Sequence, residues 1–434
     1  MDNVREIVLD ALLETERGTA FSNRIMAAVL TKYNYLEHRD KAFLKRLYEG
    51  TTELRIRLDY VLDHYSSTKT AKMKPLIRCL LRMSVYQILY MEQVPDGAAV
   101  SEAVKLCKKR GFGTLSGFVN GVLRSVAREK DHLKMPDADR DPVFFLSVEC
   151  SVPAWLAEHF LALYGRARAE KILRALLEVH PVSLRFAGGL DEAERERAVS
   201  AICDKGVILE PSPLSEDIRL ATHLEGVAGL PGYAEGAFLV QDASSALAVR
   251  AVGIRPGDFV VDACAAPGGK SLLAAELTGP SGKVLARDLG PEKVDRIREN
   301  AARMRAENVE AEVWDATQTD EALAGKADVL LLDVPCSGLG ILGKKRDIKY
   351  RITPEEIDSL QALQRRIVEA SWQMVRPGGR MLYSTCTISP KENEEQADWI
   401  EAHLPFVRTG EGRQFLPGED PCDGFYYQVF TRKA

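Results

Sequence analysis

Two cysteines in the last third of the chain stand where reactive side chains are often found, each at the end of an apolar run. Cys336 follows residues 327–332 and stands three positions after Asp333, and Cys386 ends the run 380–385. A thiolate can add to an electron-poor ring and leave again, while a neighbouring acid or base moves the protons. A single cysteine after a strand is usually a packing residue. Two cysteines at the ends of adjacent predicted strands, with an aspartate beside one of them, favour a catalytic role over a packing role.

That chemistry fits a cytosine ring. Carbon 5 of cytosine is a poor nucleophile, but a thiolate on carbon 6 converts the ring into an enamine that can attack a sulfonium methyl group. An acid beside ring nitrogen 3 stabilises the charge that builds there, and a base must then remove the proton on carbon 5. We interpret the remaining cysteines as packing residues, although one of them lies in the loop described next: Cys79, Cys107, Cys150, Cys203, Cys264 and Cys422.

A glycine-rich loop at residues 262–271, Asp-Ala-Cys-Ala-Ala-Pro-Gly-Gly-Lys-Ser, follows a short apolar strand at 258–262. Glycines let the backbone approach a ligand closely, and the first turn of the helix that follows offers free amide donors. Lys270-Ser271 imitates the end of a phosphate-binding loop, but Cys264 stands where that motif needs its first glycine. The loop therefore favours a nucleotide-like cofactor that is not held by its phosphates.

Two further predicted strands, 283–288 and 309–314, end next to the acids Asp288 and Asp315. In doubly wound sheets an acid at the first of these places accepts hydrogen bonds from ribose hydroxyls, and one at the second suits an adenine amino group. Successive strand-ending acids indicate S-adenosylmethionine. The alternative for any one of them is a cap on the helix that follows the strand.

The elements that must position these residues occupy the second half of a multidomain chain of 434 residues. Apolar residues at helical spacing predict an all-α bundle over 1–130, and Asp and Pro punctuate a linker at 131–150. A small α+β subdomain follows at 151–235. From 236 to 434, strands and helices alternate, which predicts a Rossmann-like α/β domain with a parallel sheet.

Composition narrows the class of protein. Hydrophobic residues make up 46% and charged residues 28% of the chain, no apolar run could span a bilayer, and the N-terminus lacks the order of a signal peptide. The cysteines form no CxxC pair, so we expect reduced thiols, no metal site and a cytoplasmic location. Residues 1–140 carry 24 Lys and Arg against 18 Asp and Glu, whereas the remainder carries 34 against 45. This asymmetry is compatible with RNA binding by the N-terminal bundle, or equally with a solvated basic face.

Taken together, the motifs resemble those of the RsmB (Sun/Fmu) family of 16S rRNA cytosine-C5 methyltransferases, within the NOL1/NOP2/Sun group. The cofactor loop is similar to the family's own, residues 331–338 to its DxPCS motif, and 383–386 with Pro390, Glu392 and Asn393 to its TC…PxEN motif. The ending at 423–426, Asp-Gly-Phe-Tyr, is similar to the family's DGFF. The N-terminal bundle resembles the antitermination factor NusB at residues 80–87, 94–95, 101–104 and 117–124.

The resemblance implies a role for each matching residue. Cys386 would be the nucleophile on carbon 6, Cys336 would assist proton removal and release, and Asp333 would contact the cytosine ring. DNA cytosine methyltransferases attack instead with a proline–cysteine cysteine like Cys336, so the presence of Cys386 favours RNA. S-adenosyl-L-methionine would be the cofactor, with no metal, and the residues implied around it are Cys264, Ala265, Ala266, Pro267, Gly268, Gly269, Lys270, Asp288, Lys293, Asp315 and Asp333.

The family's target is cytosine 967 of 16S rRNA, in free or early-assembly form, and a monomer is expected. The chain departs from the family at Ala187, where an asparagine is usual, and at Arg287, where an apolar residue is usual and where the cofactor rim could be altered. In the basic segment 340–349, Lys344, Arg346 and Lys349 are hypothesised to touch RNA phosphates, the alternative being a solvated basic loop.

Two other functions stay open from the sequence. A related methyltransferase could act on tRNA or on 23S rRNA with the same machinery. A binding protein, such as an RNA assembly or antitermination factor, could use the NusB-like bundle beside a relict methyltransferase fold. The presence of Cys336, Cys386 and Asp333 together argues against a relict.

Overall fold

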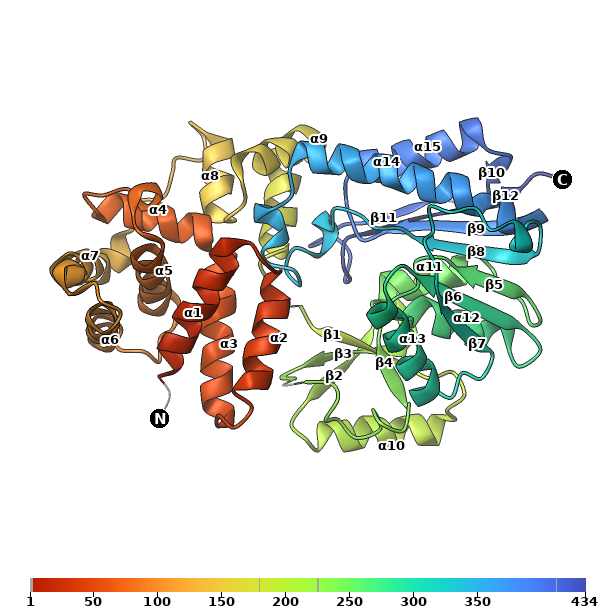
Figure 1. The fold of residues 1–434 in the computed structure, drawn as a ribbon, viewed down its shortest axis with the longest axis horizontal. Helices are drawn as coiled ribbons and strands as arrows, with labels where there is room; N and C mark the ends of the chain where they lie inside the picture. Colours follow the sequence, from red (N-terminus) through yellow and green to blue (C-terminus); the bar gives the residue numbers. More distant parts are fainter. Residues whose placement is uncertain (1–2, 179, 225, 411) are drawn as a thin grey trace. The chain divides into compact units, whose positions relative to one another are not determined.

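The computed structural model describes residues 3–178, 180–224, 226–410 and 412–434 (Figure 1). The chain divides into two compact units. The first, here the helical unit, comprises Met1–Leu177 together with Leu342–Arg351, and the second, the α/β unit, comprises Glu178–Ile341 and Ile352–Ala434. The predicted multidomain organisation, with helices first and an α/β body second, is confirmed.

The helical unit is built from nine α-helices in its described residues, in two successive groups. The first seven are α1 (Val4–Arg17), α2 (Ser22–Lys32), α3 (His38–Glu53), α4 (Arg55–Tyr65), α5 (Pro75–Tyr90), α6 (Asp96–Lys109) and α7 (Ser116–Glu129), with short 3-10 turns η1 (Thr70–Lys72), η2 (Gly113–Leu115) and η3 (Lys130–His132). Two more follow, α8 (Pro142–Glu149) and α9 (Ala154–Ala175).

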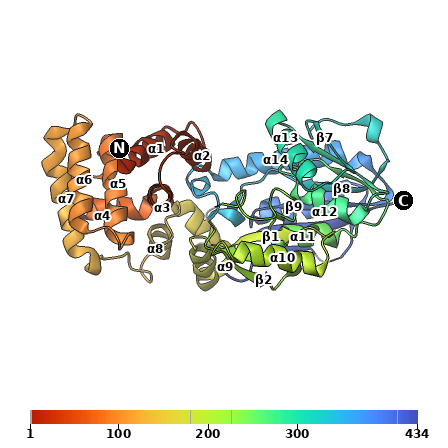
Figure 2. The ribbon, with the colours of Figure 1, turned by 90° about the horizontal axis from the view of Figure 1, so that it is seen from below.

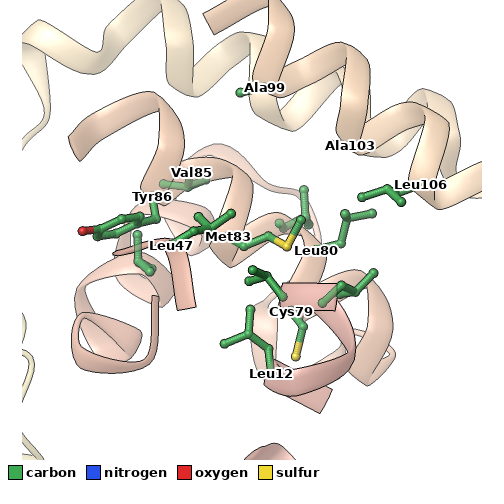
Figure 3. Packing of buried hydrophobic residues seen from close by; sticks show 14 of the residues in the cluster. Leu12, Leu47, Cys79, Leu80, Met83, Val85, Tyr86, Ala99, Ala103 and Leu106 are labelled. Carbon is green, nitrogen blue, oxygen red and sulfur yellow. The ribbon is translucent and has the colours of Figure 1, made fainter. Parts of the chain in front are cut away.

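Helix α5 is the centre of this unit. Its residues from Cys79 to Ile88 are all buried, as their nearly continuous apolar character predicts. Leu80 and Met83 belong to one cluster with residues of α1, α3 and α6, and Figure 3 shows these side chains converging around α5. Figure 2 shows α5, α6 and α7 side by side. A helix buried on every side needs neighbours on every side, which explains the bundle.

The bounds of the two units differ from the predicted ones. The segment 131–150, expected to be a linker, contains α8, and α9 belongs to the helical unit and not to the small subdomain. Asp141 caps α8 by accepting a hydrogen bond from the Phe144 amide at 2.9 Å, and Pro142 occupies the first turn. An Asp-Pro step thus starts a helix here.

A small antiparallel sheet opens the α/β unit, in the order β2-β3-β1-β4. Its strands are β1 (Val182–Phe186), β2 (Ile208–Ser212), β3 (Ser215–Thr222) and β4 (Phe238–Val240), with α10 (Glu192–Cys203) between β1 and β2. The predicted strand at 182–186 matches β1, and β4 carries the sheet a few residues past the predicted bound at 235.

The large sheet has the order β10-β12-β9-β8-β5-β6-β7, with β11 paired to β12. Strands β5 to β9 run parallel, and β12 runs antiparallel to β9. The strands are β5 (Phe259–Asp262), β6 (Lys283–Asp288), β7 (Val309–Val313), β8 (Ala327–Asp333), β9 (Val375–Thr385), β10 (Phe406–Arg408), β11 (Arg413–Phe415) and β12 (Phe425–Arg432).

Helices cover both faces of the large sheet. Figure 1 shows α14 and α15 on one side and α11, α12 and α13 on the other. Along β8, Leu330 and Leu332 pack with α14 and α15, whereas Val329 and Leu331 pack with α11 and α12, as alternation along a strand requires. The helices are α11 (Ala243–Ala251), α12 (Gly269–Thr278), α13 (Pro291–Arg303), α14 (Pro354–Ser371) and α15 (Glu394–His403), with η4 (Glu321–Leu323), η5 (Leu339–Ile341), η7 (Trp372–Met374) and η8 (Pro390–Glu392). In the described residues, no helix combines the length and apolarity needed to cross a membrane.

One sequence that is typical of a turn is part of a strand. Residues 376–379, Arg-Pro-Gly-Gly, lie inside β9, whose pairing with β8 shifts register between Ala327 and Val329. The extra residues bulge out of the ladder, and Gly378 has a φ of +72° that side-chain-bearing residues rarely adopt. The strand order reverses between β5 and β8, so the carboxyl ends of these two strands frame the crevice where doubly wound sheets bind ligands.

Candidate active site

Carboxylates gather at the carboxyl edge of the large sheet. Asp262 ends β5, Asp288 ends β6 and Asp333 ends β8, while Asp315 stands two residues beyond the end of β7. Since parallel strands end at one edge, the alternation of strand and helix brings together acids that are far apart in sequence. Such a set complements a cationic ligand better than a phosphate.

The glycine-rich loop folds tightly between β5 and α12. Gly268 has a φ of +106°, and its amide donates to the Ala265 carbonyl at 2.7 Å. The Ala266 amide donates to Asp288 Oδ2 at 3.0 Å, and Asp288 Oδ1 accepts from Lys293 Nζ at 2.9 Å. The structure thus brings the predicted cofactor loop, Asp288 and Lys293 together.

Asp262 supplies the test of whether these residues suit a cationic cofactor. Its Oδ2 accepts from Ser271 Oγ at 2.6 Å, whereas its buried Oδ1 has no hydrogen-bond partner in the described residues. Burial raises the pKa of Asp262 to about 7, although the hydrogen bond from Ser271 opposes the rise. An incompletely satisfied buried acid fits a neighbouring ammonium or sulfonium, as S-adenosyl-L-methionine carries. Burial also raises the pKa of Cys264, which agrees with a packing role.

Asp315 and Arg287 belong to the β6–β7 part of the sheet edge: Arg287 precedes Asp288 in β6, and Asp315 follows β7. Asp315 Oδ1 accepts from the hydroxyl and the amide of Thr317, at 2.7 and 2.9 Å, and these bonds lower its pKa. Arg287 is only 4% exposed, and its side chain pairs with Glu312 and Asp320 while lying over the Trp314 ring. Arg287 is therefore held by the β6–β7 region.

The two predicted reactive cysteines are neighbours. Cys336 Sγ and Cys386 Sγ lie 3.2 Å apart, although 50 positions separate them in the chain. The Gly340 amide donates to the Cys386 carbonyl at 3.1 Å, which ties the two loops together. Gly340 also lies against Gly424, where an added Cβ would stand 2.0 Å from the Gly424 carbonyl oxygen. Only glycine fits at Gly340, so the C-terminal motif around Gly424 packs against the cysteine loops.

The Lys270 side chain forms an ion pair with Asp333, the acid that ends β8. Lys270 Nζ lies 2.6 Å from Asp333 Oδ2 and 5.2 Å from the centre of the Phe425 ring, and Ser384 Oγ donates to Asp333 Oδ1 at 2.9 Å. Burial lowers the pKa of Lys270, but the Asp333 carboxylate and its hydrogen bond raise it by more, so Lys270 stays charged. From the sequence, Lys270 was expected at the cofactor, and its ion pair with Asp333 was not predicted.

Cys336 is held as a neutral thiol. Its hydrogen bond with Cys386, its burial and the charges of Cys386 and Glu392 all raise the pKa of Cys336 well above the ordinary value. A thiol with a raised pKa makes a strong base once its proton has left. Glu392 and Asn393, quoted in the sequence motif without a role, lie buried beside the two cysteine loops.

The three basic residues predicted to touch RNA have different surroundings. Lys344 is exposed, whereas Arg346 pairs with Glu49 and Glu53 at 3.4 and 3.5 Å. Lys349 is 2% exposed, and its Nζ donates to the Cys150 carbonyl at 3.3 Å. Burial lowers the pKa of Lys349 to about 8. A buried ammonium cannot meet a phosphate in this arrangement, which corrects the hypothesis for Lys349.

Arg346 and Lys349 belong to a segment that completes the helical unit. The Tyr350 hydroxyl of η6 (Ile348–Tyr350) donates to the Glu53 carbonyl at 2.6 Å, and the Arg55 guanidinium lies 3.9 Å from the centre of the Tyr350 ring. Asp347 accepts from the amide and the hydroxyl of Ser22, at 2.9 and 2.7 Å. No group of three or more His, Cys, Asp or Glu suited to a metal ion occurs in the described part of the chain.

Comparisons with known proteins agree with this geometry. Residues 249–431 match the family model described as 16S rRNA methyltransferase RsmB/F, and residues 2–128 match that of the NusB family. The probable ribosomal RNA small subunit methyltransferase B of Bacillus subtilis (strain 168) is 37% identical, covering 100% of this chain and 99% of the relative. The ribosomal RNA small subunit methyltransferase B of Vibrio cholerae is 30% identical, covering 99% and 98%.

Solved structures support the fold. The crystal structure of PH0851 has a TM-score of 0.81 at 24% identity, covering 99% of both chains. A methyltransferase homolog protein from Pyrococcus horikoshii has a TM-score of 0.58 at 23% identity, covering 67% of this chain and 99% of its own.

Proposed function

Because the chain belongs to the ribosomal RNA small subunit methyltransferase B family, we propose that it methylates carbon 5 of a cytosine in 16S rRNA, at position 967. The observation that carries the reaction is the pair of thiols 3.2 Å apart beside the Asp333 carboxylate. A methyl transfer to an amine or a hydroxyl would need no such pair, whereas transfer to a ring carbon needs a nucleophile and a base.

Cys386 begins the reaction as a thiolate. A bond forms between Sγ and carbon 6 of the ring, and the electron pair of the carbon 5–carbon 6 double bond becomes available at carbon 5. Negative charge builds at nitrogen 3 of the ring. Asp333, held by Lys270 and Ser384, contacts that edge of the ring, and the Lys270 ammonium beside it offsets the charge. Fixing this acid in advance lowers the cost of reorganisation during attack.

The loop 264–270 with Asp288, Lys293 and Asp315 would hold the cofactor at the same edge. When bound, S-adenosyl-L-methionine would supply an electrophilic methyl group to carbon 5, and S-adenosyl-L-homocysteine would leave with the electrons of the sulfur–methyl bond. The tight turn at Gly268 and the acids around it orient that ligand and complement its positive charge.

Cys336 completes the cycle. As a thiolate it takes the proton from carbon 5, the electrons of that C–H bond restore the double bond, and the bond from carbon 6 to Cys386 Sγ breaks. Cys386 leaves as a thiolate and Cys336 becomes a thiol. Before this step Cys336 must lose its own proton to solvent, and because the pKa of Cys336 is raised, that deprotonation is the costly part.

The partner is 16S rRNA, free or at an early stage of assembly. Unpaired bases are the usual targets of base-modifying enzymes because a ring stacked in a duplex is out of reach. The N-terminal helices, which match the NusB family, and the exposed Lys344 are the parts of the chain that we assign to RNA.

The test is transfer of labelled methyl from S-adenosylmethionine to protein-free 16S rRNA, 23S rRNA and tRNA, with Cys386→Ala as the control. We expect label on carbon 5 of one cytosine of 16S rRNA, and none with Cys386→Ala. Cys336→Ala should accumulate a denaturant-resistant protein–RNA adduct. Label in tRNA or 23S rRNA would overturn the substrate, and label lost with Cys336→Ala but kept with Cys386→Ala would exchange the roles of the cysteines.

A further inference from the structure

Two consecutive polar residues, Glu392 and Asn393, lie at 0% exposure where η8 meets α15. Neither faces solvent, and neither is needed to complete a helix cap, because the structure gives α15 no side-chain cap. Buried polar side chains are retained only where hydrogen bonds satisfy them, so their partners indicate what they do.

Glu392 is bound to the loop that carries Cys336. Its Oε1 accepts from the Ser337 amide at 2.8 Å, and its Oε2 accepts from Ser337 Oγ at 2.5 Å. Gln364 Nε2 donates both to Glu392 Oε1 and to the Pro335 carbonyl, each at 3.0 Å. The residues on both sides of Cys336 are therefore fixed by one buried carboxylate and one buried amide.

Asn393 is bound to the loop that carries Cys386. Its Oδ1 accepts from Thr385 Oγ1 at 2.5 Å, and its Nδ2 donates to the Thr387 carbonyl at 3.0 Å. Gln414 Oε1 accepts a second hydrogen bond from Nδ2 at 2.7 Å. Both neighbours of Cys386 are thus tied to a single amide side chain.

The charge on Glu392 is costly for the fold. Its carboxylate accepts hydrogen bonds from the neutral donors Ser337 and Gln364. Burial raises the pKa of Glu392, while these hydrogen bonds and one from Thr387 oppose the rise. Removing a carboxylate from water is unfavourable even after the surroundings relax. If only stability mattered, an apolar residue would be expected at this buried position. The presence of Glu392 therefore indicates that its hydrogen bonds to the Cys336 loop are needed.

We propose that Glu392 and Asn393 are positioning residues, one for each cysteine. Glu392 sets the Cys336 loop for proton removal and release, and Asn393 sets the Cys386 loop for attack on carbon 6. Since the two residues are adjacent in sequence, one rigid backbone segment fixes the distance between the two thiols. The two loops also meet directly, because the hydroxyl oxygens of Ser337 and Thr387 lie 2.7 Å apart. This inference rests on the proposed function and assigns to each cysteine the buried residue that holds its neighbours.

The experiment measures adduct and product separately, on 16S rRNA with labelled S-adenosylmethionine. Asn393→Ala should lower both adduct and product by about a hundredfold, because a misplaced nucleophile loses the benefit of proximity. Glu392→Ala should form the adduct and release it slowly, so the ratio of adduct to product rises by about tenfold or more. Glu392→Gln keeps an oxygen for the Ser337 amide and should restore most of the release rate.

The matched control is Glu395→Gln, one turn along α15 and exposed, whose carboxylate contacts Gln361. The ratio of adduct to product does not depend on the fraction of folded protein, so partial unfolding cannot imitate the effect of Glu392→Ala. For Asn393→Ala, the rates are divided by the folded fraction measured by circular dichroism. If Glu392→Ala and Asn393→Ala both keep the ratio and rate of Glu395→Gln, the positioning role is overturned while the methyl transfer stands. Wild-type protein that forms no 5-methylcytosine overturns the proposed function and this role with it.

Discussion

The ammonium of Lys270 lies 2.6 Å from the carboxylate of Asp333, joining the end of the cofactor loop to the end of β8. The pair crosses the point where the strand order reverses, between β5 and β8. A cofactor bound by the loop and a cytosine ring contacted by Asp333 would therefore both lie next to the Lys270–Asp333 ion pair. We expect this arrangement to couple cofactor binding to the position of the acid.

Replacing Lys270 tests that coupling. Lys270→Gln removes the charge that fixes Asp333, and we expect kcat for methyl transfer to fall about a hundredfold. Lys283→Gln is the control, because Lys283 begins β6 at the opposite edge of the sheet and pairs with Glu310 there. Equal rates for the two variants in a steady-state transfer assay would contradict a role for the Lys270–Asp333 pair.

The raised pKa of Cys336 predicts a pH dependence of release. Below that pKa the fraction of Cys336 present as thiolate rises about tenfold for each pH unit, so decay of the covalent adduct should accelerate as the pH rises. Rapid mixing followed by denaturing gels, from about pH 6 to about pH 9, measures this decay directly. A decay rate that is flat or falls with pH would show that another group removes the proton.

Asp347 predicts a stability effect confined to the helical unit. Asp347→Ala removes the acceptors for the Ser22 amide and hydroxyl and the partner of Arg351, all buried or half-buried. We expect the free energy of unfolding of the helical unit to fall by about 2–4 kcal/mol. Denaturant unfolding measures the loss, and hydrogen exchange at the Ser22 amide should accelerate.

Asp10→Asn provides the comparison for that variant. Asp10 pairs with Arg110 at an exposed site of the same unit, where an ion pair contributes little. If Asp347→Ala unfolds at the same denaturant concentration as Asp10→Asn, the segment Leu342–Arg351 does not support the helical unit in the way described.

Two lysines of the basic segment 340–349 should differ in what they contribute, Lys344 to RNA binding and Lys349 to stability. Lys344→Ala removes an exposed charge and should weaken RNA binding while lowering the dependence of log affinity on log salt by about one unit. Lys349→Ala leaves a cavity and an unpaired Cys150 carbonyl, so it should lower stability without changing that slope. Binding titrations at several salt concentrations separate the two, and an unchanged slope for Lys344→Ala would remove this residue from the RNA contacts.

Much of the α/β unit could be predicted because its signals are local. The parallel strands at 283–288 and 327–333 were predicted with their observed bounds, since buried parallel strands are short apolar runs ended by polar residues. The segment 131–150, predicted as a linker, contains α8. Asp141-Pro142 can start a helix or mark a loop, and the packing of α8 against α9 favours the helix here.

The sequence by itself determined the residue types of the site and the edge to which they go. Cys336, Cys386 and Asp333 follow strands, and parallel strands deliver their ends to one edge of a sheet whatever the register. Only the tertiary structure decided which side chains meet. The 3.2 Å between the thiols, the Lys270–Asp333 pair and the separate ties of Glu392 and Asn393 all join residues from different elements, and their distances depend on how helices pack on the sheet. The burial of Lys349 has the same cause, because the chain leaves the α/β unit at Leu342 to fold with helices more than 150 residues earlier.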